Sequence, residues 1–289
     1  MIELREGRHG SVGGLDIVRV LPTKGRRTVG PWCFVDLMLP PDATDPDPME
    51  VGPHPHIGLS TVTWIMEGEA IHSDSLGTIQ PIRPGQLNLM TAGHGIAHAE
   101  LATSRTILGV QMWLAQPEDT RHGGRAFQHV PELPVFEQPG CTGSVLVGQF
   151  AGVTSPASVD SATVGVDLDL RKGATQFVAD PGFEYCVVPV TGPVLVSGHR
   201  VDPGWVALVP EGTSDISIEA GNVGSRCMLL GGSPLGERIQ MWWNFVARTR
   251  DELTEAFRDW ERGNDDRFPG VPSTIPRIDA PRPPWLAPG

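Results

Sequence analysis

The sequence predicts an all-β protein made of two related β-barrels that pack together, with one short helix near the C-terminus. Three observations predict this fold: short runs rich in β-branched and aromatic residues, turn signals between them, and a repeated pattern of turns. Glycine (35) and proline (28) are frequent among the 289 residues, which is typical of many short strands joined by tight turns.

The first predicted elements are two strands and a loop. Residues 15–21 (LDIVRVL) and the apolar run 28–39 (TVGPWCFVDLML) each have strand character. Residues 40–50 (PPDATDPDPME) are rich in proline and acidic residues. Because proline cannot donate to a sheet or continue a helix, this stretch is predicted to be a loop.

A series of strands follows from residue 59. The turn signals Glu67-Gly68, Leu76-Gly77 and Pro84-Gly85 interrupt apolar, β-branched segments. This spacing predicts a β-meander or barrel, which residues 106–114 (TILGVQMWL) continue.

The same turn spacing occurs again in the second half of the chain. Pro84-Gly85 corresponds to Pro203-Gly204, and a further glycine follows eight residues after each pair. The repeat predicts two related barrel domains, which we place at residues 1–130 and 131–289.

One amphipathic helix is predicted over residues 249–263. Thr249 and Glu252 have capping-box spacing, apolar residues recur at helical intervals, and Gly263 is a candidate C-cap. The tail from residue 269 is rich in proline, so it is predicted to be extended.

Composition excludes several function classes. The formal net charge of −12 disfavours direct binding to nucleic acid. The four cysteines are scattered without a CxxC pair, which indicates reduced, mostly buried thiols in a cytosolic protein. No apolar run reaches the length of a membrane span and the N-terminus has no apolar signal region, so a cytoplasmic location is predicted.

Two pairs of potential metal ligands stand out. His54 and His56 are two residues apart, as are His98 and Glu100. Side chains at i and i+2 of a strand share a face, and inward faces of a small barrel converge. The pattern predicts a mononuclear site for iron(II), manganese, nickel, copper or zinc. The residues alone do not choose between an open reactive site and a closed structural zinc site.

Three neighbouring residues carry expectations of their own. Asp36 and Gln111 lie on predicted strands that flank the ligand motifs, and either could hydrogen-bond a ligand imidazole or be an ordinary polar residue of the barrel. His72 lies in a polar hairpin (IHSDS) and is predicted to be exposed to solvent.

The segment from His54 to Glu100 (HPHIGLSTVTWIMEGEAIHSDSLG…IRPGQLNLMTAGHGIAHAE) strongly resembles the pirin family of bicupin proteins. Flanking motifs (TVGPW, VQMWL and WWNF…DWERG) are similar to that family too, so the resemblance spans roughly residues 15–265. It implies two cupin (double-stranded β-helix) barrels with metal in the N-terminal cupin only. It also implies iron held by His54, His56, His98 and Glu100.

The resemblance implies two rival functions. Several pirins have quercetin 2,3-dioxygenase activity, which predicts a metal-dependent oxidoreductase, with iron(II) as the implied metal, that opens a flavonol-like ring with dioxygen. Glu100 would then be both metal ligand and general base. The alternative is a non-enzymatic, iron-binding regulatory protein that acts through a protein partner, as other pirins are described.

Two positions depart from a fully metal-binding bicupin. Residues 183–185 read Phe-Glu-Tyr where a second His-x-His would stand, so the C-terminal cupin is predicted to lack metal ligands. Ile57 follows His-Pro-His where the family commonly has arginine. This change is expected to alter the field around the ion and around any anionic substrate.

Overall fold

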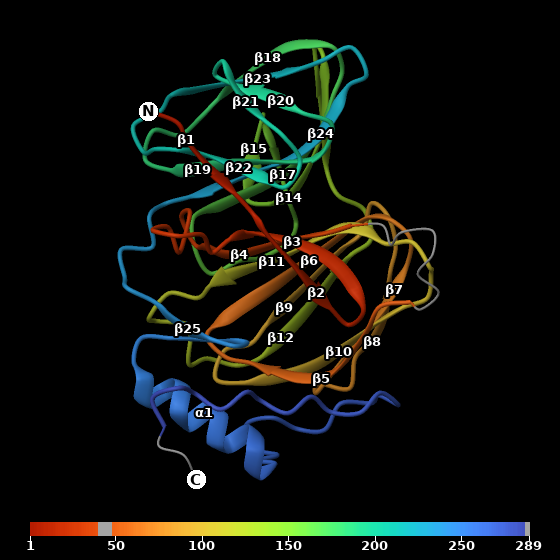
Figure 1. The fold of residues 1–289 in the computed structure, drawn as a ribbon, viewed down its shortest axis with the longest axis vertical. Helices are drawn as coiled ribbons and strands as arrows, with labels where there is room; N and C mark the ends of the chain where they lie inside the picture. The colour runs from red at the N-terminus through yellow and green to blue at the C-terminus, as the bar shows by residue number, and fades with distance from the viewer. Residues whose placement is uncertain (40–47, 287–289) are drawn as a thin grey trace.

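The computed structural model describes residues 1–39 and 48–286. Two β-barrels lie one above the other, and the single helix of the described residues lies at the far end of the lower barrel (Figure 1). The predicted all-β class with two cupin barrels and one C-terminal helix is confirmed. Most of the predicted loop 40–50 lies outside the described residues, which resume at Pro48.

The first barrel is made of a seven-stranded and a four-stranded antiparallel sheet. The strands are β2 (Arg8–Val12), β3 (Leu15–Leu21), β4 (Trp32–Met38), β5 (Glu50–His56), β6 (Leu59–Glu67), β7 (Ala70–Asp74), β8 (Ile79–Ile82), β9 (Leu87–Thr91), β10 (Ile96–Ala102), β11 (Leu108–Ala115) and β12 (Ala126–Val130). The larger sheet has the order β12-β9-β6-β11-β4-β3-β2 and the smaller one β5-β10-β7-β8.

The second barrel repeats this architecture. Its strands are β13 (Val135–Gln138), β14 (Cys141–Val147), β15 (Gln149–Phe150), β16 (Val153–Thr154), β17 (Thr163–Leu170), β18 (Gly173–Val178), β19 (Glu184–Thr191), β20 (Val194–Val196), β21 (His199–Val201), β22 (Trp205–Val209), β23 (Asp215–Ala220) and β24 (Ser225–Gly232). Its four-stranded sheet has the order β18-β23-β20-β21. Gly85 and Gly204, aligned from the sequence repeat, have φ of +84° and +85° in equivalent turns, a conformation that favours glycine.

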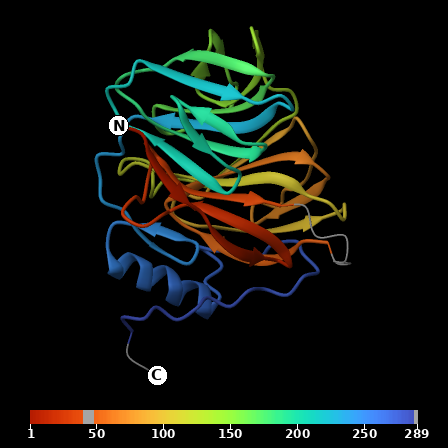
Figure 2. The same ribbon diagram turned by 45° about the horizontal axis from the view of Figure 1, so that its top comes forward.

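Each end of the chain packs on the barrel of the other half. Strand β1 (Glu3–Glu6) pairs with β22 at the edge of the second barrel's seven-stranded sheet. Strands β25 (Gln240–Trp242) and β26 (Phe245–Ala247) lie against the first barrel, where the Val246 amide donates to the Ile57 carbonyl at 3.1 Å. Figure 2 shows both crossings. The predicted division at residue 130 falls between β12 and β13 and stays a prediction.

The largest apolar cluster lies between the two barrels, where their seven-stranded sheets face each other. Trp32 is fully buried in it, and its indole N–H is 3.1 Å from both the Val164 and the Gly231 carbonyl oxygens. Trp64 donates to the Asp167 carboxylate at 2.9 Å. Side chains of the first barrel therefore anchor directly in the backbone and side chains of the second.

The helix α1 (Arg250–Arg262) forms as the sequence predicts. Thr249 caps it in a capping box with Glu252, and Gly263 closes it in the left-handed conformation. The buried side chains Leu253 and Trp260 join a cluster that holds the helix against the first barrel. The helix is not long and apolar enough to span a bilayer.

Replacing the N-cap Thr249 by alanine is expected to lower the free energy of unfolding by about 1 kcal/mol, because the amide of Glu252 loses its acceptor. Thr249→Ser keeps the hydroxyl and is the matched control. Urea denaturation measures both, and equal midpoints for the two variants would contradict the capping role.

Candidate metal centre

The two predicted ligand pairs lie on neighbouring antiparallel strands. On β5, His54 and His56 are on the same face, and on β10, His98 is directly opposite His54. The register shifts between His98 and Glu100, so that Glu100 lies opposite Val51. Strand alternation and register together bring both pairs to one interior.

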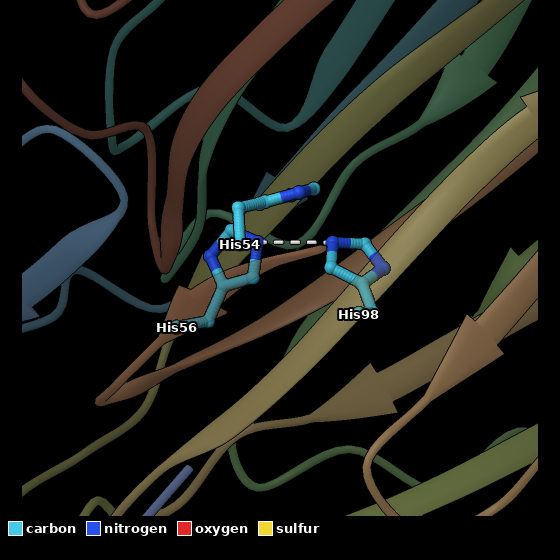
Figure 3. A group of neighbouring side chains, drawn as sticks. All are labelled: His54, His56 and His98. Carbon is cyan, nitrogen blue, oxygen red and sulfur yellow. Dashed lines mark hydrogen bonds between the residues drawn. The ribbon is translucent and has the colours of Figure 1, made fainter. Parts of the chain in front are cut away.

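Three imidazoles converge from these strands. The ring centroids of His54 and His98 are 4.3 Å apart, those of His56 and His98 4.9 Å, and those of His54 and His56 5.0 Å. The Nε2 atoms of His56 and His98 are 3.0 Å apart (Figure 3). All three residues are buried, and their ring nitrogens form one group that could hold a metal ion.

Two backbone carbonyls fix the tautomers of two of these rings. Nδ1 of His54 is 2.9 Å from the Gly52 carbonyl oxygen, and Nδ1 of His56 is 3.1 Å from the Asn244 carbonyl oxygen. A carbonyl only accepts, so each neutral ring carries its hydrogen on Nδ1 and has an unprotonated Nε2. Asn244 comes from the β25–β26 turn, 188 residues beyond His56.

The two side chains expected to orient the ligands have other partners. Asp36 accepts two hydrogen bonds from the Arg19 guanidinium, each of 2.8 Å. The Gln111 side-chain oxygen accepts from the Thr63 hydroxyl at 3.0 Å. Both line the cavity described below, but the carbonyls of Gly52 and Asn244 orient the imidazoles, and no feature of the sequence indicates a backbone acceptor.

The prediction that His72 is exposed is wrong. His72 is 3% exposed, because β7 lies inside the four-stranded sheet between β10 and β8, and its ring stacks on Phe127 with a centroid separation of 4.6 Å. Its Nδ1 lies 3.3 Å from Nδ1 of His98, and its Nε2 lies 3.2 Å from an Asp74 carboxylate oxygen.

Asp74 is fully buried and held by the turn that follows it. One carboxylate oxygen accepts the amides of Leu76 (2.8 Å) and Thr78 (3.1 Å). Burial alone would raise the pKa of Asp74, but the hydrogen bonds from His72 and these amides outweigh it and lower the pKa. Asp74 is therefore a carboxylate at neutral pH.

Glu100 lies at the margin of the three imidazoles. It is opposite His72 in the strand pairing, and its carboxylate, His72 and His98 form a second group that could hold a metal ion. The Thr63 hydroxyl is 3.5 Å from one of its oxygens. The structure thus gathers three of the four predicted ligands in one group and places Glu100 in a second group that shares His98.

Burial sets the protonation of these residues. It lowers the pKa of His54 to about 4 and the pKa values of His56 and His98 well below their ordinary value. Burial also raises the pKa of Glu100. The nearby His72 and the hydrogen bond from Thr63 lower this pKa, but they offset only part of the rise. Three neutral imidazoles and a half-buried carboxyl group form a nitrogen and oxygen donor set that fits a divalent transition metal.

The three imidazoles and Glu100 open onto a cavity of about 330 Å³, within the range of small-molecule sites. The rings of Phe34 and Trp113, which line it, stack at a centroid separation of 3.9 Å. The Arg19 guanidinium lies 4.3 Å from the Phe34 centroid. Ile278 of the C-terminal segment also lines the cavity, so both chain halves contribute to its wall.

Ile57, the residue that follows the His-Pro-His motif, has a packing role. Ile57 is 5% exposed and forms a bridge with Phe245. It belongs to the apolar cluster that includes Leu253 and Trp260 of the helix. Isoleucine here helps to hold the C-terminal segment on the barrel.

In the described parts of the chain, both groups of residues that could hold a metal lie in the first barrel. At the corresponding place in the second barrel, Tyr185 is buried in the apolar core, and its hydroxyl accepts the Asp180 amide at 2.8 Å. His199, the histidine of that hairpin region, is exposed.

The low pKa of His54 predicts a pH-dependent stability of the metal-free protein. An unfolded histidine titrates near 6.5, whereas folded His54 titrates at about 4. Between these values the unfolded chain binds a proton that the folded protein excludes. The free energy of unfolding should therefore fall as the pH drops from about 6.5 to about 4, by about 3 kcal/mol from this residue.

Urea denaturation in the presence of a chelator, at several pH values, measures this effect. His54→Gln is expected to show a shallower dependence on pH. An identical dependence in variant and wild type would contradict the assignment to His54.

Comparison with known proteins gives a consistent set of relatives. The family models for Pirin and for the Pirin C-terminal cupin domain match residues 14–114 and 165–268. A Pseudomonas aeruginosa protein named "Putative quercetin 2,3-dioxygenase" is 42% identical, over 94% of this chain and 87% of its own length. A pirin-like protein of Caulobacter vibrioides is 34% identical, over 89% of this chain and 92% of its own.

A solved structure is also closely similar. The crystal structure of quercetin 2,3-dioxygenase from Acinetobacter baumannii superposes with a TM-score of 0.92 and 40% sequence identity. The match covers 99% of this chain and 97% of that one. The whole two-barrel arrangement is therefore shared, including the terminal segments that cross between barrels.

Proposed function

The chain belongs to the pirin family, and from this we propose that it is a metal-dependent dioxygenase that opens the ring of a flavonol-like substrate. The observation that carries the proposal is the convergence of three buried imidazoles on a cavity that Glu100 also lines. The names of the similar proteins from Pseudomonas and Acinetobacter support the same reaction class.

In this proposal His54, His56, His98 and Glu100 hold one divalent metal ion. Iron(II) is the proposed metal, with manganese, nickel, copper or zinc as alternatives. When bound, such an ion acts as a Lewis acid that lowers the pKa of a coordinated hydroxyl group and provides open positions for dioxygen chemistry.

The protein's own residues then bind the substrate and move its proton. The stacked rings of Phe34 and Trp113 give part of the cavity lining an aromatic character, which suits the aromatic rings of a flavonol. Glu100 would accept the substrate hydroxyl proton, because burial has already raised its pKa toward that of an effective general base.

The proposal is tested by loading chelator-treated protein with each of the five metals in turn and adding quercetin in air. The expected result, with at least one metal, is loss of the flavonol absorbance together with oxygen uptake and release of carbon monoxide. Free metal and metal-free protein are the controls. Tight metal binding without turnover by any metal would overturn the enzymatic proposal and favour a regulatory protein that acts through a protein partner.

A further inference from the structure

We propose that His72 and Asp74 are positioning residues that fix the tautomer of His98, so that its Nε2 lone pair faces the metal position. The inference deepens the proposed function and rests on it, since His98 is one of the proposed ligands. It concerns three buried side chains that are hydrogen-bonded in series, starting at the site and leading outward: His98, His72 and Asp74.

The hydrogen bond between His72 and Asp74 has a defined donor and a defined acceptor. Asp74 is fully buried, and one of its oxygens is taken by the amides of Leu76 and Thr78. Its other oxygen is 3.2 Å from Nε2 of His72. Because a carboxylate only accepts, His72 must carry a hydrogen on Nε2, and in a neutral ring its Nδ1 is then an acceptor.

The position of the hydrogen on His72 in turn determines the position of the hydrogen on His98. Nδ1 of His72 lies 3.3 Å from Nδ1 of His98. With His72 as acceptor, His98 carries its hydrogen on Nδ1 and has an unprotonated Nε2. This Nε2 lies 3.0 Å from Nε2 of His56. In the metal-loaded protein both lone pairs would be directed at the ion, whereas without an ion one of the two nitrogens has to donate to the other. In the metal-loaded protein, all three imidazoles would then have an unprotonated Nε2 available for the ion.

The His98–His72–Asp74 series is held rigidly and orients only one of the proposed metal ligands. The rings of His72 and Phe127 stack with an interplanar angle of 21°, and the strand register pairs His98 with Asp74. His54 and His56 owe their tautomers to backbone carbonyls, which a side-chain substitution does not remove. His98 alone depends on side chains, so its ability to bind a metal can be changed without touching a ligand.

The decisive variant is Asp74→Asn. Asparagine can turn its NH₂ group toward Nε2 of His72, which makes that nitrogen an acceptor and moves the ring hydrogen to Nδ1. His72 would then donate to Nδ1 of His98, whose own hydrogen would move to Nε2 and block the metal-binding atom. We expect the affinity for nickel(II) or copper(II) to fall about 10- to 100-fold, as for other partners of metal-bound histidines.

A pair of variants at His72 separates positioning from packing. His72→Gln can still accept from Nδ1 of His98 through its amide oxygen, and is expected to keep most of the affinity. His72→Leu cannot accept, and is expected to lose it. His129→Gln removes a partly buried histidine that hydrogen-bonds Asn88 elsewhere in the barrel, and should bind metal like the wild type.

Two readouts besides activity make the result unambiguous. In copper(II)-loaded protein, the nitrogen hyperfine pattern in electron paramagnetic resonance should show one imidazole fewer in Asp74→Asn. In zinc(II)-loaded, ¹⁵N-histidine-labelled protein, His98 of the wild type should show a protonated Nδ1 and a metal-bound Nε2, and Asp74→Asn should lose this pattern.

Unchanged affinity, hyperfine pattern and tautomer in Asp74→Asn and His72→Leu would overturn the inference. The zinc(II) measurement requires metal binding but no reaction, so it tests the inference separately from the proposed dioxygenase activity. A wild type that binds no zinc(II) would overturn both the inference and the proposed centre. Conversely, a tautomer change in a protein without dioxygenase activity would support the inference and leave only the reaction unsupported.

Discussion

His98→Ala is expected to reduce bound metal from about one ion per chain to less than about a tenth, and to abolish flavonol turnover. His98 belongs to both groups of potential ligands. Its loss leaves the imidazoles of His54 and His56 on β5, and removes the residue that links them to the Glu100 carboxylate. Elemental analysis of the reloaded, desalted protein measures the metal, and the absorbance of quercetin measures turnover.

The matched control is His199→Ala, at an exposed histidine of the second barrel. It should retain both metal and turnover. Thermal unfolding of the metal-free proteins shows whether His98→Ala still folds. A folded His98→Ala protein with full metal content would refute the proposed centre.

Trp32→Ala is expected to have the largest effect on stability, a loss of about 3–5 kcal/mol. The indole fills the core between the barrels and is fully buried. Its removal leaves a cavity and takes the shared donor from the carbonyls of Val164 and Gly231. The midpoint of guanidinium unfolding, followed by signals from both barrels, measures the change.

Trp205→Ala is the control for the loss of a tryptophan. Trp205 is 36% exposed, so its removal should cost much less. Trp32→Phe should fall between the two, because it keeps an aromatic ring and loses the N–H. If Trp32→Ala unfolded at the wild-type midpoint, the interface between the barrels would not support their stability.

Local signals in the sequence were sufficient for much of the fold. The run LDIVRVL corresponds to β3, the capping box marks the start of the helix, and Gly85 and Gly204 mark equivalent turns. Strand β2 (RHGSV) escaped prediction because all its residues are exposed and it has no apolar alternation. Strand β1 pairs with a strand some 200 residues away, which no local pattern encodes.

For the candidate site too, local features could be predicted from the sequence and tertiary ones could not. The i/i+2 spacing of His54 and His56 translated directly into a shared face, because strand alternation is a local property. The orientation of their rings was not predictable, since it depends on carbonyls that only tertiary structure brings near. His72 was misjudged because its polar neighbours suggested solvent, whereas the sheet order places it inside the barrel.

The carbonyl of Asn244 that orients His56 has a consequence for biosynthesis. A ribosome delivers the chain from its N-terminus, so all the proposed ligands emerge long before residue 244 does. During that interval the nascent first barrel lacks the acceptor for His56 and the cover that Ile278 provides. In the proposed centre, the imidazole of His56 is therefore expected to gain its orienting acceptor only after the whole first barrel and residue 244 have been synthesised.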